Sequence, residues 1–240
     1  MQEIVPSPAS GRVFTEPARP TLADCAPTGR IRLDSLARWA QDVAYADSVD
    51  AGLARQAAWV VRRSRMRVIR FPRFGEHFTL ATFCSALGRM WAERRTSMTA
   101  AGDTAGAVEL VSLWVHLDPL TGRPTKLSEE EIEMWGESTA GRTVNARLRH
   151  PGPDGATDGF PWMFRSSELD LAGHVNNAAY LTPLEEELLQ DAEPEAIDIE
   201  IEYRSPAQPG EMRVLRHGSR RWIVNPEGET HASILIKQED

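Results

Sequence analysis

The alternation of hydrophobic and polar positions divides the chain into two blocks, each with one helix followed by several strands. Apolar residues at helical spacing predict the helix of the first block: Leu33, Leu36, Ala37, Ala40 and Ala44. Gly52 is suited to end this helix. Strand-like segments follow at 58–69, 76–87, 90–100 and 107–118, and glycine-containing turns separate them.

The second block begins after a change in composition near residue 140. The stretch RHPGPDGATDG (149–159) is rich in Pro, Gly and Asp and predicts an exposed linker. A short strand within 162–170, a helix, and strands at 196–203, 211–218, 220–228 and 230–238 are expected after it. The strand at 196–203 alternates strictly, with Ile199 and Ile201 on one face and Glu200 and Glu202 on the other. We therefore expect one unit at 1–139, a linker at 140–160 and a second unit at 161–240.

The two blocks correspond at three points that occur in the same order. GRI at Gly29 resembles GHV at Gly173, PRFGE at Pro72 resembles PAQPGE at Pro206, and the glycine turn at 100–103 resembles PEGE at 226–229. Three ordered matches indicate an internal duplication with a shorter second copy. A helix followed by antiparallel strands forms an α+β unit in which the sheet curls around a central helix. Two such units are expected to share one continuous sheet.

Composition narrows the class of protein. Apolar residues make up 41% of the 240 residues and charged residues 26%, as in globular proteins. No apolar run approaches the ~20 residues of a membrane helix, and MQEIVPSPAS lacks the features of a secretory signal. Cys25 and Cys84 cannot form a disulfide framework or a four-ligand metal site, so a reduced, cytoplasmic setting is expected. The net charge of −8 argues against general nucleic-acid binding.

Arginines cluster in one predicted strand despite the acidic balance. Arg63, Arg65 and Arg67 share one face of the strand at 58–69, opposite Ser64 and Met66. One interpretation is a solvated sheet face. The other is a basic patch that steers an acidic partner.

The stretch DLAGHVNNAAY (170–180) combines groups that a packing pattern does not require. Asn176 or Asn177 is suited to cap the following helix, and Asp170 is suited to bond its own turn. The alternative is chemical: His174 and a carboxylate beside a helix N-terminus are the groups needed to add water to an activated carbonyl. A thioester suits such a site because the leaving thiolate needs little protonation.

The duplication places Arg30 at the position of His174 and Ala26 at that of Asp170, so a site of this kind is expected once per chain. No metal is expected, because the six histidines lack ligand spacing. No cofactor is expected either.

These residues resemble the acyl-acyl carrier protein thioesterases, tandem hot-dog proteins whose second half carries the motif D-x-N-x-H-V-N-N-x-x-Y. The segments TGRIRLDSLARWAQDVA, WVVRRSRMRVIRFPRFGE, ERRTSM and SLWVHLDPLTGRPTKL are also similar, and the resemblance covers roughly residues 12 to 205. It implies hydrolysis of a fatty acyl thioester on the phosphopantetheine of acyl carrier protein, which releases free fatty acid. The resemblance is compatible with a homodimer.

The resemblance also implies roles for individual residues. Asp170 and His174 match the catalytic aspartate and histidine, and the rest of the motif is expected to contact substrate: Asn176, Asn177 and Tyr180. Because carrier protein is acidic, Arg63, Arg65 and Arg67 become a candidate docking surface. The first half is expected to shape the acyl pocket, with four candidate lining residues: Trp39, Trp59, Met90 and Trp91.

The chain departs from the family pattern at two positions, and a proline is unexpected at a third. Ala172 replaces the motif asparagine, and Pro206 stands where the family has a glutamate. Pro183 falls inside the predicted second helix, which must therefore start later or bend. Three hypotheses follow: a thioesterase, a protein that binds carrier protein or acyl groups without turnover, and a hydratase or dehydratase. The last usually has five steps from Asp to His, whereas this chain has four.

Overall fold

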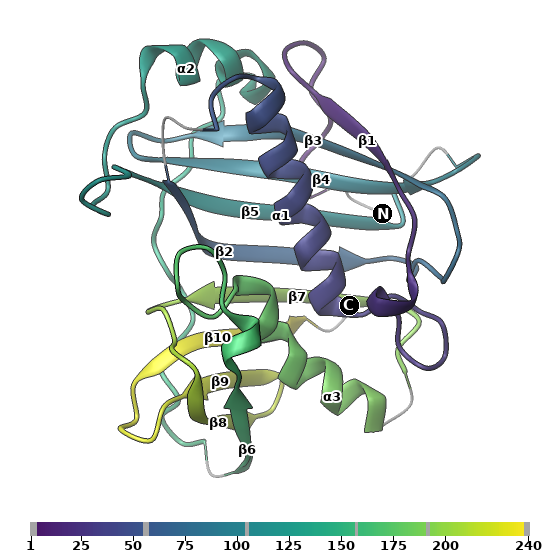
Figure 1. Ribbon diagram of the computed structural model, residues 1–240, viewed down its shortest axis with the longest axis vertical. Coiled ribbons are helices and arrows are strands. Elements are labelled where there is room, and N and C mark those ends of the chain that lie inside the picture. The colour runs from purple at the N-terminus through teal and green to yellow at the C-terminus, as the bar shows by residue number, and fades with distance from the viewer. Residues whose placement is uncertain (1–3, 55–57, 104–105, 157, 191–192, 238–240) are drawn as a thin grey trace.

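The ten strands of the described residues form one antiparallel sheet in the order β1-β3-β4-β5-β2-β7-β10-β9-β8-β6 (Figure 1). The computed structural model describes residues 4–54, 58–103, 106–156, 158–190 and 193–237. The first half contains β1 (Phe14–Ala18), α1 (Leu33–Asp50), β2 (Ala58–Val68), β3 (Phe78–Leu87), β4 (Trp91–Ala100), β5 (Val108–Leu117) and α2 (Glu129–Gly136). The second half contains β6 (Asp158–Phe164), α3 (Thr182–Gln190), β7 (Ile197–Tyr203), β8 (Gly210–His217), β9 (Arg220–Val224) and β10 (Thr230–Lys237).

Most of the predicted helices and strands are confirmed, with boundaries that differ by a few residues. The strand expected within 162–170 is misplaced: β6 begins at Asp158, inside the predicted linker, and a 3-10 helix, Ser166–Glu168, follows it. Helix α1 crosses the first-half strands and α3 lies over second-half strands (Figure 1). The main core lies between these helices and the sheet, and it contains Leu33, Leu36 and Val43 of α1 together with Leu184 of α3. No helix among the described residues is long and apolar enough to cross a bilayer.

Two elements were not anticipated from the pattern. Strand β1 is short, contains Pro17 and lies at the edge of the sheet, a position where a missing backbone donor is tolerated. Helix α2 begins with a capping box, in which the side chains of Ser128 and Glu131 each accept a hydrogen bond from the other residue's backbone N–H. Its eight residues are too few to predict a helix by spacing alone.

The expected duplication is visible in the hydrogen bonds of two turns. In the turn at 26–30 the Ala26 N–H donates to the Arg30 carbonyl (2.7 Å), and in the turn at 170–174 the Asp170 N–H donates to the His174 carbonyl (2.9 Å). The fourth residue of each turn is a glycine, with φ of 85° and 74°, a conformation that costs glycine little. The two copies therefore share local backbone geometry as well as spacing.

Pro183 lies in the first turn of α3, because that helix starts at Thr182. Proline is tolerated there, since the first turn needs no backbone N–H from it. A 3-10 helix, Asn177–Leu181, precedes α3. Asn176 is its N-cap and accepts a hydrogen bond from the Ala178 N–H (2.9 Å), which confirms the predicted capping role. The helix starts later than the apolar pattern indicated and does not need to bend at the proline.

Strands β2 and β7 form the seam between the halves, and their charges are complementary. The arginine face of β2 lies opposite the acidic face of β7. Arg65 and Arg67 both bind Asp198, at 2.6 and 3.0 Å. Burial raises the pKa of Asp198, but the two guanidinium groups lower it more, so it lies below its ordinary value. Part of the predicted basic patch is thus neutralised at the seam.

The described residues at 140–160 are exposed or half-buried, with one exception. His150 is 8% exposed. The fully buried Glu202 carboxylate of β7 accepts hydrogen bonds from the backbone N–H groups of Arg149 (2.6 Å) and His150 (2.9 Å). An acidic side chain on the outer face of the sheet therefore fixes the linker to the second half.

Candidate active site

The loop at 170–176 follows β6 and a short 3-10 helix, Ser166–Glu168, and leads into the Asn176 cap. A bridge between Leu169 and Val175 closes its base. The Val175 N–H donates to the Ala207 carbonyl (3.1 Å), which ties the loop to the segment after β7. The loop is thus a fixed hairpin, and Asp170 and His174 are both half-buried on it.

The two predicted catalytic side chains are close in sequence but make no direct contact. Asp170 Oδ1 accepts a hydrogen bond from the Ala172 N–H (2.8 Å), which is the turn role that its residue type favours. Within the described part of the chain, no hydrogen bond or ion pair involves the His174 side chain. The imidazole is therefore unengaged, while one carboxylate oxygen of Asp170 is already used. Their catalytic roles stay a prediction.

Tyr180 of the motif has a structural position beneath this loop. It is 2% exposed, and its hydroxyl accepts a hydrogen bond from the Ala207 N–H (2.8 Å). Burial, with a smaller contribution from the charge of Asp170, raises its pKa to about 12. The phenol is therefore neutral at physiological pH. Its ring packs edge-on against Tyr203 at 5.5 Å, and the Tyr203 hydroxyl donates to the Asn177 carbonyl (3.0 Å).

The sequence reasoning missed Gln41, which connects the loop to α1. The Asn176 side-chain amide donates to Gln41 Oε1 (3.2 Å). Gln41 lines both of the cavities described next. The available signal was a polar residue between Ala40 and Val43, two residues that the structure buries in the core.

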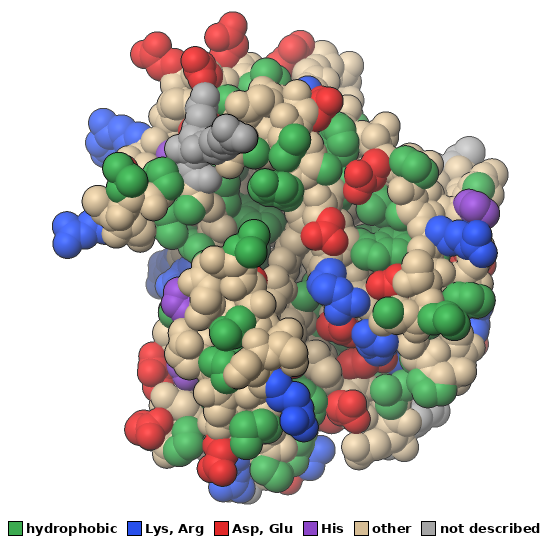
Figure 2. Space-filling model, in the orientation of Figure 1, with side chains coloured by type: hydrophobic (Ala, Val, Ile, Leu, Met, Phe, Trp, Pro, Cys, Tyr) green, Lys and Arg blue, Asp and Glu red, His purple; other side chains and the backbone are tan. Residues whose placement is uncertain are grey.

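A mainly apolar pocket of about 470 Å³ opens beside the loop, within the size range of small-molecule sites. Leu171 and Ala172 form its second-half wall, and the rest comes from the first half. Figure 2 shows hydrophobic side chains gathered around a recess in the upper left of the molecule. A narrower cavity between the halves shares Gln41 and Trp114 with this pocket. Asn177 lines the narrower cavity, whereas Asp170, His174 and Tyr180 line neither.

Of the four aromatic and Met candidates for the pocket wall, only Trp59 lines it. Trp39 faces a separate shallow cleft beside β1. The Trp91 indole donates to the Val144 carbonyl (2.6 Å) and so holds the chain after α2. Met90 lines neither of the two cavities beside the loop.

The equivalent position in the first half is built differently. Arg30, which corresponds to His174, is 2% exposed, and its Nη2 lies 2.9 Å from Glu185 Oε1 of α3. These two atoms are not aligned for a hydrogen bond, so the contact is an ion pair. The other oxygen of Glu185 accepts the Leu33 N–H at the start of α1 (3.0 Å). The first-half turn therefore holds the halves together and has no imidazole to offer.

One group among the described residues has ligand atoms close enough to hold a metal: His150, Glu200 and Glu202, with atoms within 4.8 Å of one another. Its carboxylates are already engaged, because Glu200 binds Lys237 at 2.9 Å and Glu202 accepts two linker N–H groups. The His150 imidazole, 3.6 Å from Glu200, and the Lys237 ammonium outweigh burial and lower the pKa of Glu200 to about 2. We interpret the group as a clamp on the linker.

The pattern of the chain matches two domain families in order. Residues 12–135 match the acyl-ACP thioesterase N-terminal domain, and residues 158–235 match the acyl-ACP thioesterase C-terminal domain. An uncharacterized protein of Mycobacterium tuberculosis is 30% identical over 228 residues, which cover 92% of this chain and 88% of the relative.

Solved structures share the whole fold at low identity. A putative oleoyl thioesterase from Lactobacillus plantarum has a TM-score of 0.76 at 23% identity and covers 95% of this chain and 96% of its own. An acyl-ACP thioesterase from Bacteroides thetaiotaomicron has a TM-score of 0.78 at 16% identity, and the match covers 93% of this chain and 96% of that one. A 12:0-ACP thioesterase from Umbellularia californica has a TM-score of 0.73 at 18% identity, and the match covers 94% of this chain and 96% of that one. Because both thioesterase domains match in order and the sheet is shared from end to end, the chain belongs to the acyl-ACP thioesterase family and has its tandem hot-dog fold.

Proposed function

We propose that the protein hydrolyses fatty acyl thioesters carried by acyl carrier protein and releases free fatty acid. Family and fold support thioester hydrolysis in general. The observation that carries the specific proposal is the apolar pocket of about 470 Å³ that begins at Leu171 and Ala172, inside the motif loop. An acyl chain in this pocket brings its thioester to the loop that carries His174.

In the proposed reaction, His174 takes a proton from a water molecule that attacks the thioester carbonyl. Asp170 stabilises the charge that develops on the imidazole, through the oxygen that its own turn does not use. The Asn177 backbone N–H stabilises the oxyanion, since the N–H groups of Ala178 and Ala179 already bond Asn176. The products are a thiol and a carboxylic acid. Both cysteines are free thiols, which fits the cytoplasmic location that we propose.

The test is direct. Purified protein is incubated with acyl-acyl carrier protein and acyl-CoA of varied chain length, and free thiol is measured with a chromogenic disulfide. Turnover well above the uncatalysed rate is expected with at least one chain length. Absence of turnover across the series, with binding retained, would replace hydrolysis by the second candidate below.

The second candidate is a protein that binds carrier protein or acyl groups without turnover. Ala172 and Pro206 favour it, because neither side chain can supply the hydrogen bonds of the family's asparagine and glutamate. The engaged oxygen of Asp170 favours it as well.

Restoring the motif asparagine separates these candidates. Ala172 is exposed and lines the pocket, so Ala172→Asn adds an amide without crowding the core. If the chain is a hydrolase with a weakened site, we expect kcat to rise on the order of tenfold, as one hydrogen bond to a charged transition state provides. Leu171→Asn is the matched control, because it places the same amide on the neighbouring exposed residue. An equal rise in both variants would argue against a motif effect.

Carrier-protein docking is the finer part of the proposal. Among the described residues, the Arg63 guanidinium bonds only the Arg147 carbonyl (2.9 Å), so its charge is not neutralised there by a carboxylate, unlike those of Arg65 and Arg67. We expect Arg63→Glu to lower kcat/KM for acyl-acyl carrier protein roughly tenfold, mainly through slower association. Acyl-CoA hydrolysis and the exposed control Arg123→Glu should be unchanged. A loss that is equal on both substrates would contradict docking at Arg63.

A further inference from the structure

We propose that the larger pocket selects acyl chains that carry an oxygen acceptor, a hydroxyl or oxo group, on the part of the chain far from the thioester. Arg94 is the residue that would bind this oxygen. The inference deepens the proposed function and rests on it for the direction in which the chain enters. It starts from an unexpected feature, a guanidinium in the wall of a mainly apolar pocket.

Sheet order places Arg94 at the end of the pocket away from the motif loop. From the seam outward the strands run β2, β5, β4 and β3. The pocket wall contains Trp59 on β2, Trp114 on β5, Ala92 and Arg94 on β4, and Cys84 on β3. Leu171 and Ala172 belong to the second half, on the other side of the seam. A chain that enters at the loop therefore passes the aromatic residues before it reaches Arg94.

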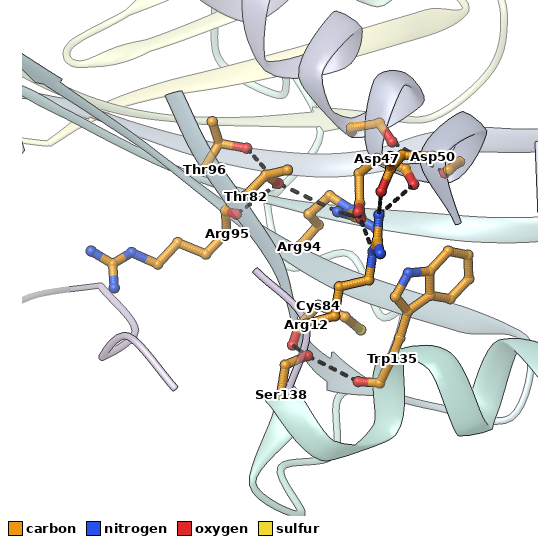
Figure 3. A network of polar contacts seen from close by, with 12 residues as sticks. Arg12, Asp47, Asp50, Thr82, Cys84, Arg94, Arg95, Thr96, Trp135 and Ser138 are labelled. Carbon is orange, nitrogen blue, oxygen red and sulfur yellow. Dashed lines mark hydrogen bonds and ion pairs between the residues drawn. The ribbon is translucent and has the colours of Figure 1, made fainter. Parts of the chain in front are cut away.

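The hydrogen bonds of Arg94 leave part of its guanidinium available. Nη1 donates to Asp47 Oδ2 (2.5 Å) and lies 3.5 Å from the Thr82 hydroxyl. Nε and Nη2 have no hydrogen-bond partner in the described part of the chain. Asp47 is shared, because Arg12 Nε also donates to its Oδ1 (2.6 Å). Figure 3 shows Arg12 and Arg94 converging on this carboxylate of α1.

The other polar groups that line this end include a free donor and no carboxylate. Trp135 of α2 lines the pocket at 3% exposure, and its indole N–H has no partner among the described residues. The Arg94 guanidinium lies 5.7 Å from the centre of this ring. Burial raises the pKa of the Cys84 thiol to about 12, so the thiol stays neutral. The Ser48 hydroxyl is donated to the Ala44 carbonyl (3.1 Å). Donors thus exceed acceptors here.

This imbalance decides between two kinds of chain. A plain methyl end would exclude water from the free guanidinium nitrogens and give them nothing in return, and an unsatisfied donor is costly when buried. A hydroxyl or oxo oxygen at the same place accepts a charge-assisted hydrogen bond. Such bonds correspond to a preference of roughly tenfold to a hundredfold. The apolar wall of the pocket still requires an aliphatic chain between the two ends.

The experiment measures binding and needs no turnover. Saturated fatty acids of increasing length, their ω-hydroxy and ω-oxo counterparts, and the matching α,ω-dicarboxylic acids displace a fluorescent fatty acid from the parent protein. We expect the ω-hydroxy or ω-oxo acid to bind at least roughly tenfold tighter than the plain acid at one or more lengths. Equal or tighter binding of the plain acid at every length would overturn the proposal. Preference for the dicarboxylic acid alone would also overturn it and would assign the site to an anion.

Arg94→Met tests the residue itself. Arg12 still neutralises Asp47 in this variant, so the fold should be kept, and thermal unfolding checks this. The preference for the oxygenated chain should fall to within about threefold, and persistence of the full preference would overturn the role of Arg94. If Arg94→Met does not fold, Arg94→Lys keeps the ion pair with a different donor geometry and should reduce the preference. An unchanged preference in Arg94→Lys would then count against the proposal. Because His174→Ala should retain the binding preference, failure of hydrolysis and failure of this inference are distinguishable.

Discussion

Replacing His174 by alanine should lower kcat/KM for acyl thioesters by about 10²–10⁴-fold, the usual contribution of a general base. The imidazole makes no hydrogen bond to any described residue, so its removal should not disturb the fold. Free thiol release from the best acyl substrate is the measurement. His217→Ala is the matched control, because His217 is an exposed histidine at the end of β8 in the same half. Loss of activity in both variants would point to damage to the fold, and full activity in His174→Ala would remove this histidine from the mechanism.

Asp170→Asn completes this test, because it separates the two roles of the aspartate. An asparagine oxygen can still accept the Ala172 N–H, so the turn is kept while the negative charge is lost. If the carboxylate supports the imidazole, activity should fall by at least about tenfold. Unchanged activity would make Asp170 a turn residue only. Asp154→Asn, in the exposed linker, is the control for the change in net charge.

Removing Glu185 should destabilise the protein by up to about 3–5 kcal/mol, the cost of breaking a buried ion pair, because Arg30 then keeps only one described carboxylate, the partly exposed Glu193, at 3.2 Å. The two oxygens of Glu185 hold Arg30 and the first N–H of α1, and both ionic side chains are 2% exposed. The free energy of unfolding of Glu185→Ala is measured by urea denaturation at constant slope. The neighbouring Glu186 is exposed, so Glu186→Ala should change stability by less than about 0.5 kcal/mol.

A double variant shows where this stability comes from. Arg30→Met combined with Glu185→Leu removes both charges and keeps apolar volume, so it should recover most of the loss. A double variant as unstable as Glu185→Ala would mean that loss of the hydrogen bond to Leu33, and not loss of the ion pair with Arg30, causes the damage. Either result bears on the site, since this contact joins α3 to the start of α1, which carries Gln41 and part of the pocket wall.

Much of the fold follows from local pattern. Apolar residues recur every 3.6 residues in α1 and every second residue in β7, because one face of each element is buried. This spacing can be read from the sequence of each segment alone. The sequence indicated the duplication because both copies keep a glycine, Gly29 and Gly173, at a left-handed turn. The sequence indicated the family because residues 170–180 match its motif. By contrast, β1 is five residues long and is fixed by its pairing with β3, and α2 is marked in the sequence only by its capping box.

The tertiary fold determines which residues come together at the candidate site. Periodicity tells which residues share a face, but it does not tell which strand or helix lies against that face. For that reason the sequence indicated an arginine-rich face on β2 and an acidic face on β7, and only the antiparallel pairing of the two strands showed that Arg65 and Arg67 bind Asp198. It also indicated the loop of Asp170 and His174, while folding alone brought Gln41 and Arg94 into one pocket beside it. The local sequence determined the elements and the motif loop, and tertiary packing determined which charged side chains pair with one another and which remain free.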